Sequence, residues 1–197
     1  VILLFAFFLL TVPTKSKLKN RLFAGLLLLS AFDLSSFFSE NFFYSTLSFE
    51  VFRMTASLLI MPVFYMYVKS VCYSDFRLKQ KDLLLLIPFV VANLVLIPRF
   101  YFANAIESVS VFEHFKQMLE IRFFYILVEI QYVFYIVLIF TILKKYKETY
   151  LENFTNSDNS SYKWLFQMTV LFLIAHSVVF FKSLIRYTDY HALLNGS

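Results

Sequence analysis

Four polar side chains interrupt apolar stretches of the sequence at similar distances from a charged residue. They are Asp33, Asn93, Glu129 and His176. Each lies six or seven residues from the nearest charged residue at one end of its apolar stretch. At a helical rise of about 1.5 Å per residue, this spacing would place all four about 9–11 Å below one boundary of a membrane. We therefore expect a single polar layer contributed by four different helices.

Polar groups at such a depth need partners. A charged group at mid-membrane costs from about 2.5 kcal/mol upward, so these side chains usually face the interior of a helical bundle. Arg53, Gln131 and Lys182 lie close to the layer and are predicted to be accessory to it. Three interpretations are open: a hydrogen-bonded cluster that fixes helix packing, a pocket for a small extracytoplasmic ligand, or a path for protons or ions.

The sequence carries no pattern that is typical of catalysis or of metal binding. The H-E-x-x-H, G-x-S-x-G and P-loop motifs and a pair of intramembrane aspartates are all absent. Cys72 is the only cysteine, which excludes an intrachain disulfide, and three widely separated histidines make no structural zinc pattern. We predict a protein that is not an enzyme and that has no catalytic residue, no cofactor and no metal site.

The composition predicts the elements that position the polar layer. Of the 197 residues, 60% are hydrophobic and 21% are aromatic, and the mean hydropathy is +0.70. Apolar blocks separated by short charged connections are typical of spanning helices. Six such blocks occupy residues 1–12, 22–39, 54–73, 83–102, 123–143 and 164–185. We predict an all-α, polytopic integral membrane bundle that forms a single transmembrane domain, residues 1–197, with no soluble domain.

Prolines and aromatic residues add detail to these blocks. Pro62 and Pro88 fall inside two of them and are predicted to kink the helices, because proline removes an intrahelical hydrogen bond. Pro98 lies near the end of a block. The aromatic run of residues 100–102 follows it and is predicted to belong to an interfacial belt.

The basic residues predict the orientation. Twelve of the eighteen Lys and Arg residues lie in the first, third and fifth connections between blocks, when Lys69 near the end of the third block is counted with the third connection. Cytoplasmic connections accumulate Lys and Arg, so we predict that these odd-numbered connections are cytoplasmic and that the N-terminus is outside. The net charge of +5 and the pI of about 9.2 are therefore assigned to topology and not to a nucleic-acid partner.

Both ends of the sequence look cut. The first block is interpreted as the remainder of a truncated spanning helix, with a signal peptide as the weaker alternative. The sixth block ends on the predicted outer side, so a cytoplasmic continuation requires one more helix after Ser197. We expect the parent protein to have seven helices.

Several junctions between connections and helices resemble a known family. They are NRLFAGLLLLSAFDLSSFF, FRMTASLLIMPVFYMYVKSVCYSDFRLKQKDLLLLIPF, LKKYKETYLEN and YKWLFQMTVLFLIAHS. These segments are similar to the N-terminal membrane region of bacterial AraC-type transcription regulators, in which about seven helices precede a cytoplasmic DNA-binding domain. The similarity covers most of the chain. Its distinctive parts are the junction MPVFYMYVKSVCYSDF and the entry SYKWLFQ into the sixth block.

The resemblance implies a sensory or anchoring domain in the bacterial inner membrane. Such a domain would relay an extracytoplasmic or membrane signal to a helix-turn-helix pair that these residues do not include, so contact with DNA would go only through that pair. The implied partners are the lipid bilayer, a small extracytoplasmic ligand and, by family analogy, a second copy in a homodimer. The alternatives are a small-molecule transporter or channel subunit, and the sensor part of a histidine kinase.

Overall fold

The computed structural model describes residues 1–14, 16–35, 47–73, 75–101, 118–153 and 160–187. All regular structure in these ranges is helical, which confirms the predicted all-α class for the described part of the chain. The chain divides into two compact units, Val1–Leu138 and Ile139–Ser197.

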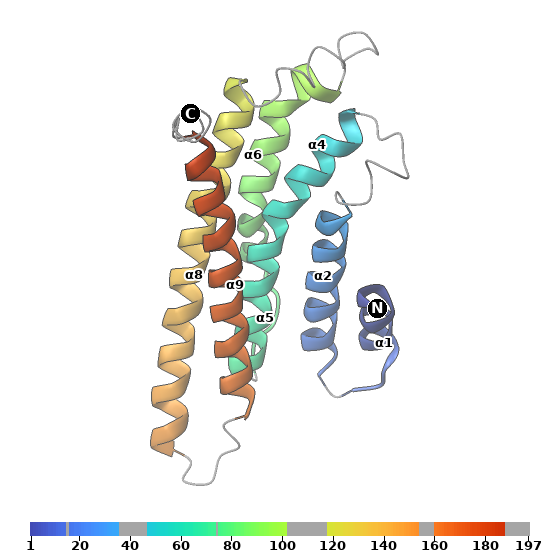
Figure 1. Ribbon diagram of the computed structural model, residues 1–197. Helices are drawn as coiled ribbons and strands as arrows, with labels where there is room; N and C mark the ends of the chain where they lie inside the picture. Colours follow the sequence, from blue (N-terminus) through green and yellow to red (C-terminus); the bar gives the residue numbers. More distant parts are fainter. Residues whose placement is uncertain (15, 36–46, 74, 102–117, 154–159, 188–197) are drawn as a thin grey trace. The chain divides into compact units, whose positions relative to one another are not determined.

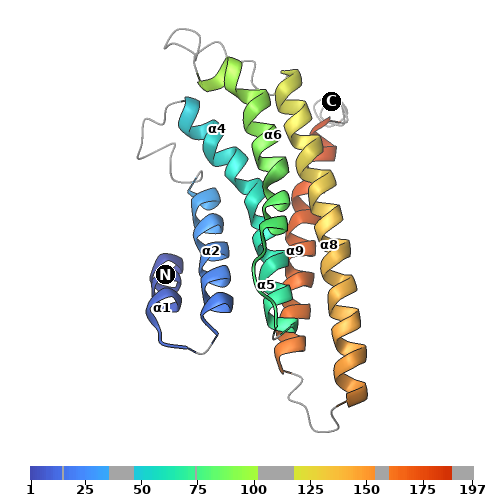
Figure 2. The same ribbon diagram turned by 180° about the vertical axis from the view of Figure 1, so that it is seen from behind.

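The first unit opens with two helices that pack against each other, α1 (Ile2–Thr11) and α2 (Lys17–Leu34) (Figure 1). A bent rod follows, made of α4 (Leu47–Ala56), a 3₁₀ turn (Ser57–Leu59) and α5 (Ile60–Cys72). Helix α5 packs on α2, and the bend between α4 and α5 is visible from both sides (Figures 1 and 2).

The next rod runs back along the first. It consists of a 3₁₀ segment (Gln80–Leu86), α6 (Ile87–Leu96) and a π-helical turn (Ile97–Tyr101), and α6 packs on α4. Helix α8 (Leu119–Asn153) then begins in the first unit and continues into the second.

The second unit contains the end of α8 and helix α9 (Ser160–Tyr187), which covers the sixth predicted block. Inside this unit, the rings of Phe140 and Phe166 meet edge to face at 6.1 Å, and Tyr162 stacks on Phe166 at 6.0 Å. The contact between Phe140 and Phe166 adds to the packing of α8 against α9, whereas the stacking of Tyr162 on Phe166 lies within α9.

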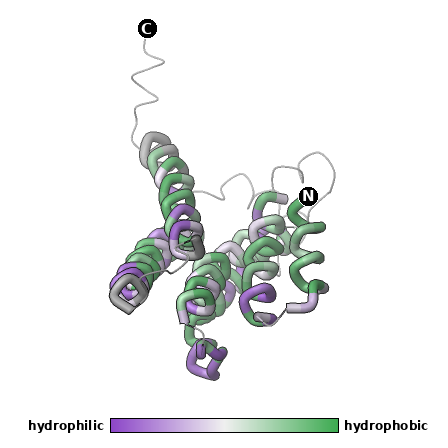
Figure 3. The backbone as a smooth tube through the Cα atoms, turned by 90° about the horizontal axis from the view of Figure 1, so that it is seen from below, coloured by the Kyte–Doolittle hydropathy of each residue, from purple (hydrophilic) through white to green (hydrophobic). Residues whose placement is uncertain are grey.

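Three helical rods in the described residues are long and apolar enough to cross a membrane. They are Leu47–Cys72, Gln80–Tyr101 and Leu119–Thr149, and they match the third, fourth and fifth predicted blocks. Helix α1 is a shorter apolar helix that is almost entirely hydrophobic in Figure 3. That all six blocks cross the membrane stays a prediction.

Each of the three prolines in these rods lies beside a turn that is not α-helical. Pro62 follows the 3₁₀ turn Ser57–Leu59, and Pro88 is the second residue of α6, directly after another 3₁₀ segment. Pro98 lies in the π-helical turn. A proline has no N–H to bond the carbonyl four residues earlier, and its ring crowds that carbonyl, so the regular helix gives way at these points.

Two clusters of buried apolar side chains hold the first unit together. The first joins the start of α4, the end of α6 and the start of α8: Leu47, Val51, Leu96, Phe100 and Ile121. The second lies farther along the same helices: Leu58, Ala92 and Phe124. Other large apolar residues are exposed, which suits lipid, because association inside a bilayer depends on close packing and polar contacts more than on hydrophobic burial.

The predicted aromatic belt is wrong for Phe100. This ring is fully buried in the first cluster. The π-helical turn adds a residue to the helical repeat and so rotates the end of the rod relative to a regular α-helix. The adjacent Phe102 lies outside the described residues.

Candidate functional site

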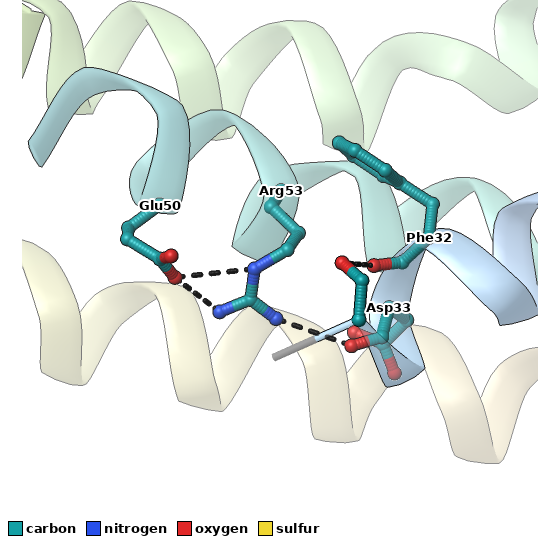
Figure 4. Close-up of polar contacts among 5 residues, drawn as sticks. Phe32, Asp33, Glu50 and Arg53 are labelled. Atoms are coloured by element: carbon teal, nitrogen blue, oxygen red, sulfur yellow. Dashed lines mark hydrogen bonds and ion pairs between the residues drawn. The ribbon is translucent and has the colours of Figure 1, made fainter. Parts of the chain in front are cut away.

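The first group of polar contacts joins the end of α2 to α4. Arg53 pairs with Glu50 one turn earlier on α4, through Nη2 and through Nε at 3.1 Å. Its Nη1 donates to the backbone carbonyl of Asp33 at 3.1 Å (Figure 4). The last carbonyls of a helix have no intrahelical donor and carry partial negative charge, so a guanidinium is a favourable cap there. The ion pair is mostly buried, with 13% and 19% of the two side chains exposed.

The second group joins α4 to the rod that contains α6. The Oδ1 atom of Asn93 accepts hydrogen bonds from the hydroxyl of Tyr101 at 2.6 Å and from Thr55 at 3.2 Å. The Nδ2 atom of Asn93 donates to the carbonyl of Phe89 at 2.8 Å, which fixes the orientation of the amide. Thr55 is fully buried, and its hydroxyl also lies 2.9 Å from the carbonyl of Phe52.

The third group joins the bent rod to α8. Pro62 cannot donate to the carbonyl of Leu58, which lies four residues earlier. The Nε2 atom of Gln131 donates to this carbonyl at 2.8 Å and thereby replaces the missing donor. Both Pro62 and Gln131 are buried, so water does not compete with the contact from outside. Within a bilayer, neighbouring helices supply such replacement bonds.

The three groups lie toward one end of the first unit. The first apolar cluster brings the start of α4, the end of α6 and the start of α8 together, and Arg53 ties the end of α2 to α4. An ion pair between Arg99 and Glu120, at 2.9 Å, adds a more exposed link between the second rod and α8 at the same end. The described polar contacts between helices are therefore concentrated where the sequence predicts the outer side.

The remaining predicted residues lie elsewhere. Glu129 is half-buried on α8, two residues before Gln131 and hence on another face of that helix. His176 is half-buried on α9, in the second unit. Lys182 lies farther along α9, where the structure describes the backbone. It stays a prediction that His176 lies in one polar layer with Asp33, Asn93 and Glu129.

Sequence reasoning identified Asn93, Gln131 and Arg53 but missed most of their partners. The partner of Gln131 had a readable signal: Pro62 frees the carbonyl of Leu58, so a nearby donor was required. The signal for Tyr101 was weaker, because this residue belongs to an aromatic run near the end of a block, and such a run predicted an interfacial belt and not a hydrogen bond. A hydrogen bond from Arg53 to a backbone carbonyl has no signature in side-chain types.

The described contacts can position helices. Among the residues that the structure describes, no three His, Cys, Asp or Glu side chains gather where they could hold a metal ion. The donors and acceptors above are mostly engaged with each other or with backbone carbonyls. An arrangement of this kind can hold a set of helices in one packing and release it when a bond is lost.

Comparisons with protein-family models, with curated proteins and with solved structures found no match to this chain.

Proposed function

We propose that this chain is the membrane-embedded sensory domain of a bacterial AraC-type transcription regulator. It lies in the inner membrane as a polytopic bundle with its N-terminus outside. It relays an extracytoplasmic or membrane signal to a cytoplasmic helix-turn-helix pair encoded outside these 197 residues. The resemblance of the four junction segments to this family supports the identity of the output domain.

The membrane setting is supported by three long apolar rods and by the distribution of basic residues. The rods carry exposed apolar side chains, such as Leu94, Ile130 and Val133, that would meet lipid. The odd-numbered connections, counted with Lys69, hold twelve Lys and Arg residues, twice as many as the six in the rest of the chain, as expected for cytoplasmic connections.

The observation that carries the sensory role is the set of hydrogen bonds between helices near the predicted outer side. Arg53 joins α2 to α4 and Asn93 joins α4 to α6. Gln131 joins α8 to the 3₁₀ turn Ser57–Leu59, through the carbonyl of Leu58. A signal that favours one bonded arrangement over another changes the relative populations of two helix packings. The helices extend to the predicted cytoplasmic side, so they carry that change toward the output domain.

The experiment is to sequence the gene beyond the codon for Ser197 and to delete it in the native bacterium. The proposal expects a last helix followed by a cytoplasmic helix-turn-helix pair, together with altered transcription of a small set of genes. A reading frame that terminates soon after a seventh helix, with no transcriptional change, would support a transporter or channel subunit and refute the proposal. A histidine kinase domain downstream would support the sensory role of this chain and refute the proposed helix-turn-helix output.

A further inference from the structure

We propose that the 3₁₀ turn Ser57–Leu59 is a hinge between α4 and α5, and that Gln131 on α8 is the side chain that locks it. The hinge is a property of the first unit and does not depend on which output domain follows the chain. It assigns a conformational role to a residue that the sequence places among accessory polar groups.

The backbone is weakened at this point by the sequence itself. Pro62 removes the hydrogen bond to the carbonyl of Leu58, and a mid-helix 3₁₀ turn, which often marks a hinge, precedes it. The turn therefore has fewer internal bonds to resist bending than the α-helices on either side.

The two sides of the turn differ in their main apolar contacts, although α2 reaches both sides. On the α4 side, Leu47 and Val51 lie in the cluster with the end of α6 and the start of α8. On the α5 side, Tyr67 stacks on Phe23 of α2 at 5.0 Å, in a separate contact. Movement at the turn would shift the first group relative to the second, and the hydrogen bond from Arg53 of α4 to the carbonyl of Asp33 on α2 would have to lengthen or break.

Gln131 is placed to control this movement. Its Nε2 bonds the carbonyl that Pro62 leaves free, and Tyr135, one turn further along α8, meets Tyr65 of α5 with ring centroids 5.6 Å apart. The same face of α8 thus holds both the turn and α5. On the other side of the turn, Thr55 is bonded to Asn93 of α6.

Gln131 has one polar atom that the lock does not use. Gln131 is 94% buried, and its Oε1 atom has no hydrogen-bond partner among the described residues. A movement that gives Oε1 a donor would offset part of the cost of releasing the carbonyl of Leu58, because an unsatisfied buried acceptor costs at least as much free energy as a single hydrogen bond contributes.

The test measures the angle of the hinge by electron paramagnetic resonance. Leu28→Cys on α2 and Phe49→Cys on α4 are exposed sites for two spin labels, in a Cys72→Ala background and in lipid nanodiscs. The unsubstituted hinge should give one distance population. Gln131→Leu should add a second population, and Pro62→Ala in the same chain should remove it, because the restored N–H bonds the carbonyl of Leu58.

The matched control is Gln167→Leu, the same substitution at an exposed position of α9, which should leave the distances unchanged. A single population in Gln131→Leu, or a second population that Pro62→Ala fails to remove, would overturn the proposal. If the Gln131→Leu variant does not insert into the membrane, the spin-label distances are compared between Pro62→Ala alone and the double variant Pro62→Ala with Gln131→Leu. These two must then have the same distances, and any difference refutes the lock.

Discussion

The hydrogen bond between Thr55 and Asn93 makes a quantitative prediction about the coupling of α4 to α6. Thr55→Val keeps the shape of the side chain and removes the hydroxyl, which lies 3.2 Å from Oδ1 of Asn93. Asn93→Leu removes the acceptor shared by Thr55 and Tyr101. The two single variants and the double variant form a cycle whose coupling energy isolates the contact between α4 and α6.

The geometry sets the expected size. The Thr55 hydroxyl has one proton and two acceptors in reach, the Asn93 amide and the carbonyl of Phe52 at 2.9 Å, so the contact between helices is only partly occupied. Hydrogen bonds between membrane helices average about 0.6 kcal/mol, with a maximum of about 1.7 kcal/mol. We expect a coupling of about 0.6 kcal/mol. The loss for Asn93→Leu alone should be about 1–2 kcal/mol, because the shorter bond from Tyr101 is lost too.

The assay measures the free energy of reversible unfolding in mixed bicelles, either by steric trapping or by titration with a denaturing detergent. Thr169→Val is the matched control, since Thr169 is also fully buried but its hydroxyl donates within α9, to the carbonyl of Leu165 at 2.8 Å. That variant should change the free energy of unfolding by only a few tenths of a kcal/mol. A coupling energy near zero, with Thr55→Val no more costly than Thr169→Val, would refute the contact.

Further predictions concern the ion pairs and the orientation. Arg53→Met should reduce the free energy of unfolding by about 3 kcal/mol, because it leaves a mostly buried carboxylate without its cation. Arg99→Met, at the more exposed pair, should reduce it by less than about 1 kcal/mol. Unfolding of both variants in bicelles of equal composition measures the two losses, and equal losses would contradict the difference in burial. In a Cys72→Ala background, an impermeant maleimide should label Asp75→Cys only in inverted vesicles and Leu119→Cys only in spheroplasts. The reverse pattern would invert the predicted topology. The native thiol of Cys72 is buried and should react with maleimide only after unfolding.

The sequence predicted the helices of the first unit better than their contacts. Runs of apolar residues separated by charges were sufficient to locate the three long rods, because length and hydropathy are read directly from the chain. The first residues of the helices were predicted less accurately. The predicted block begins at residue 54, whereas the rod begins seven residues earlier, at Leu47. Glu50 and Arg53 were read as a connection, although they neutralise each other inside the helix.

The partners of the polar residues depended on features that residue types do not encode. Arg53 caps a backbone carbonyl of α2, and every residue has such a carbonyl. Tyr101 reaches Asn93 from eight residues away because a π-helical turn lies between them, and the sequence showed only an aromatic run near a proline. The depth of each polar residue could be predicted by counting residues from the nearest charged residue. The rotation of each helix about its axis, which decides the partners, could not be predicted in this way.

The proposed relay of a signal through these contacts is tested most directly by transcription in the native bacterium. The full-length protein should carry Asn93→Leu, with Gln167→Leu as the control, and transcripts of the genes affected by its deletion should be measured at equal protein levels. The contact between α4 and α6 that Asn93→Leu removes contributes about 0.6 kcal/mol, and a shift of that size in a two-state equilibrium changes the ratio of states about threefold. We expect transcription to change by about that factor for Asn93→Leu and not to change for Gln167→Leu. Unchanged transcription in an Asn93→Leu protein that inserts normally would contradict the proposed relay.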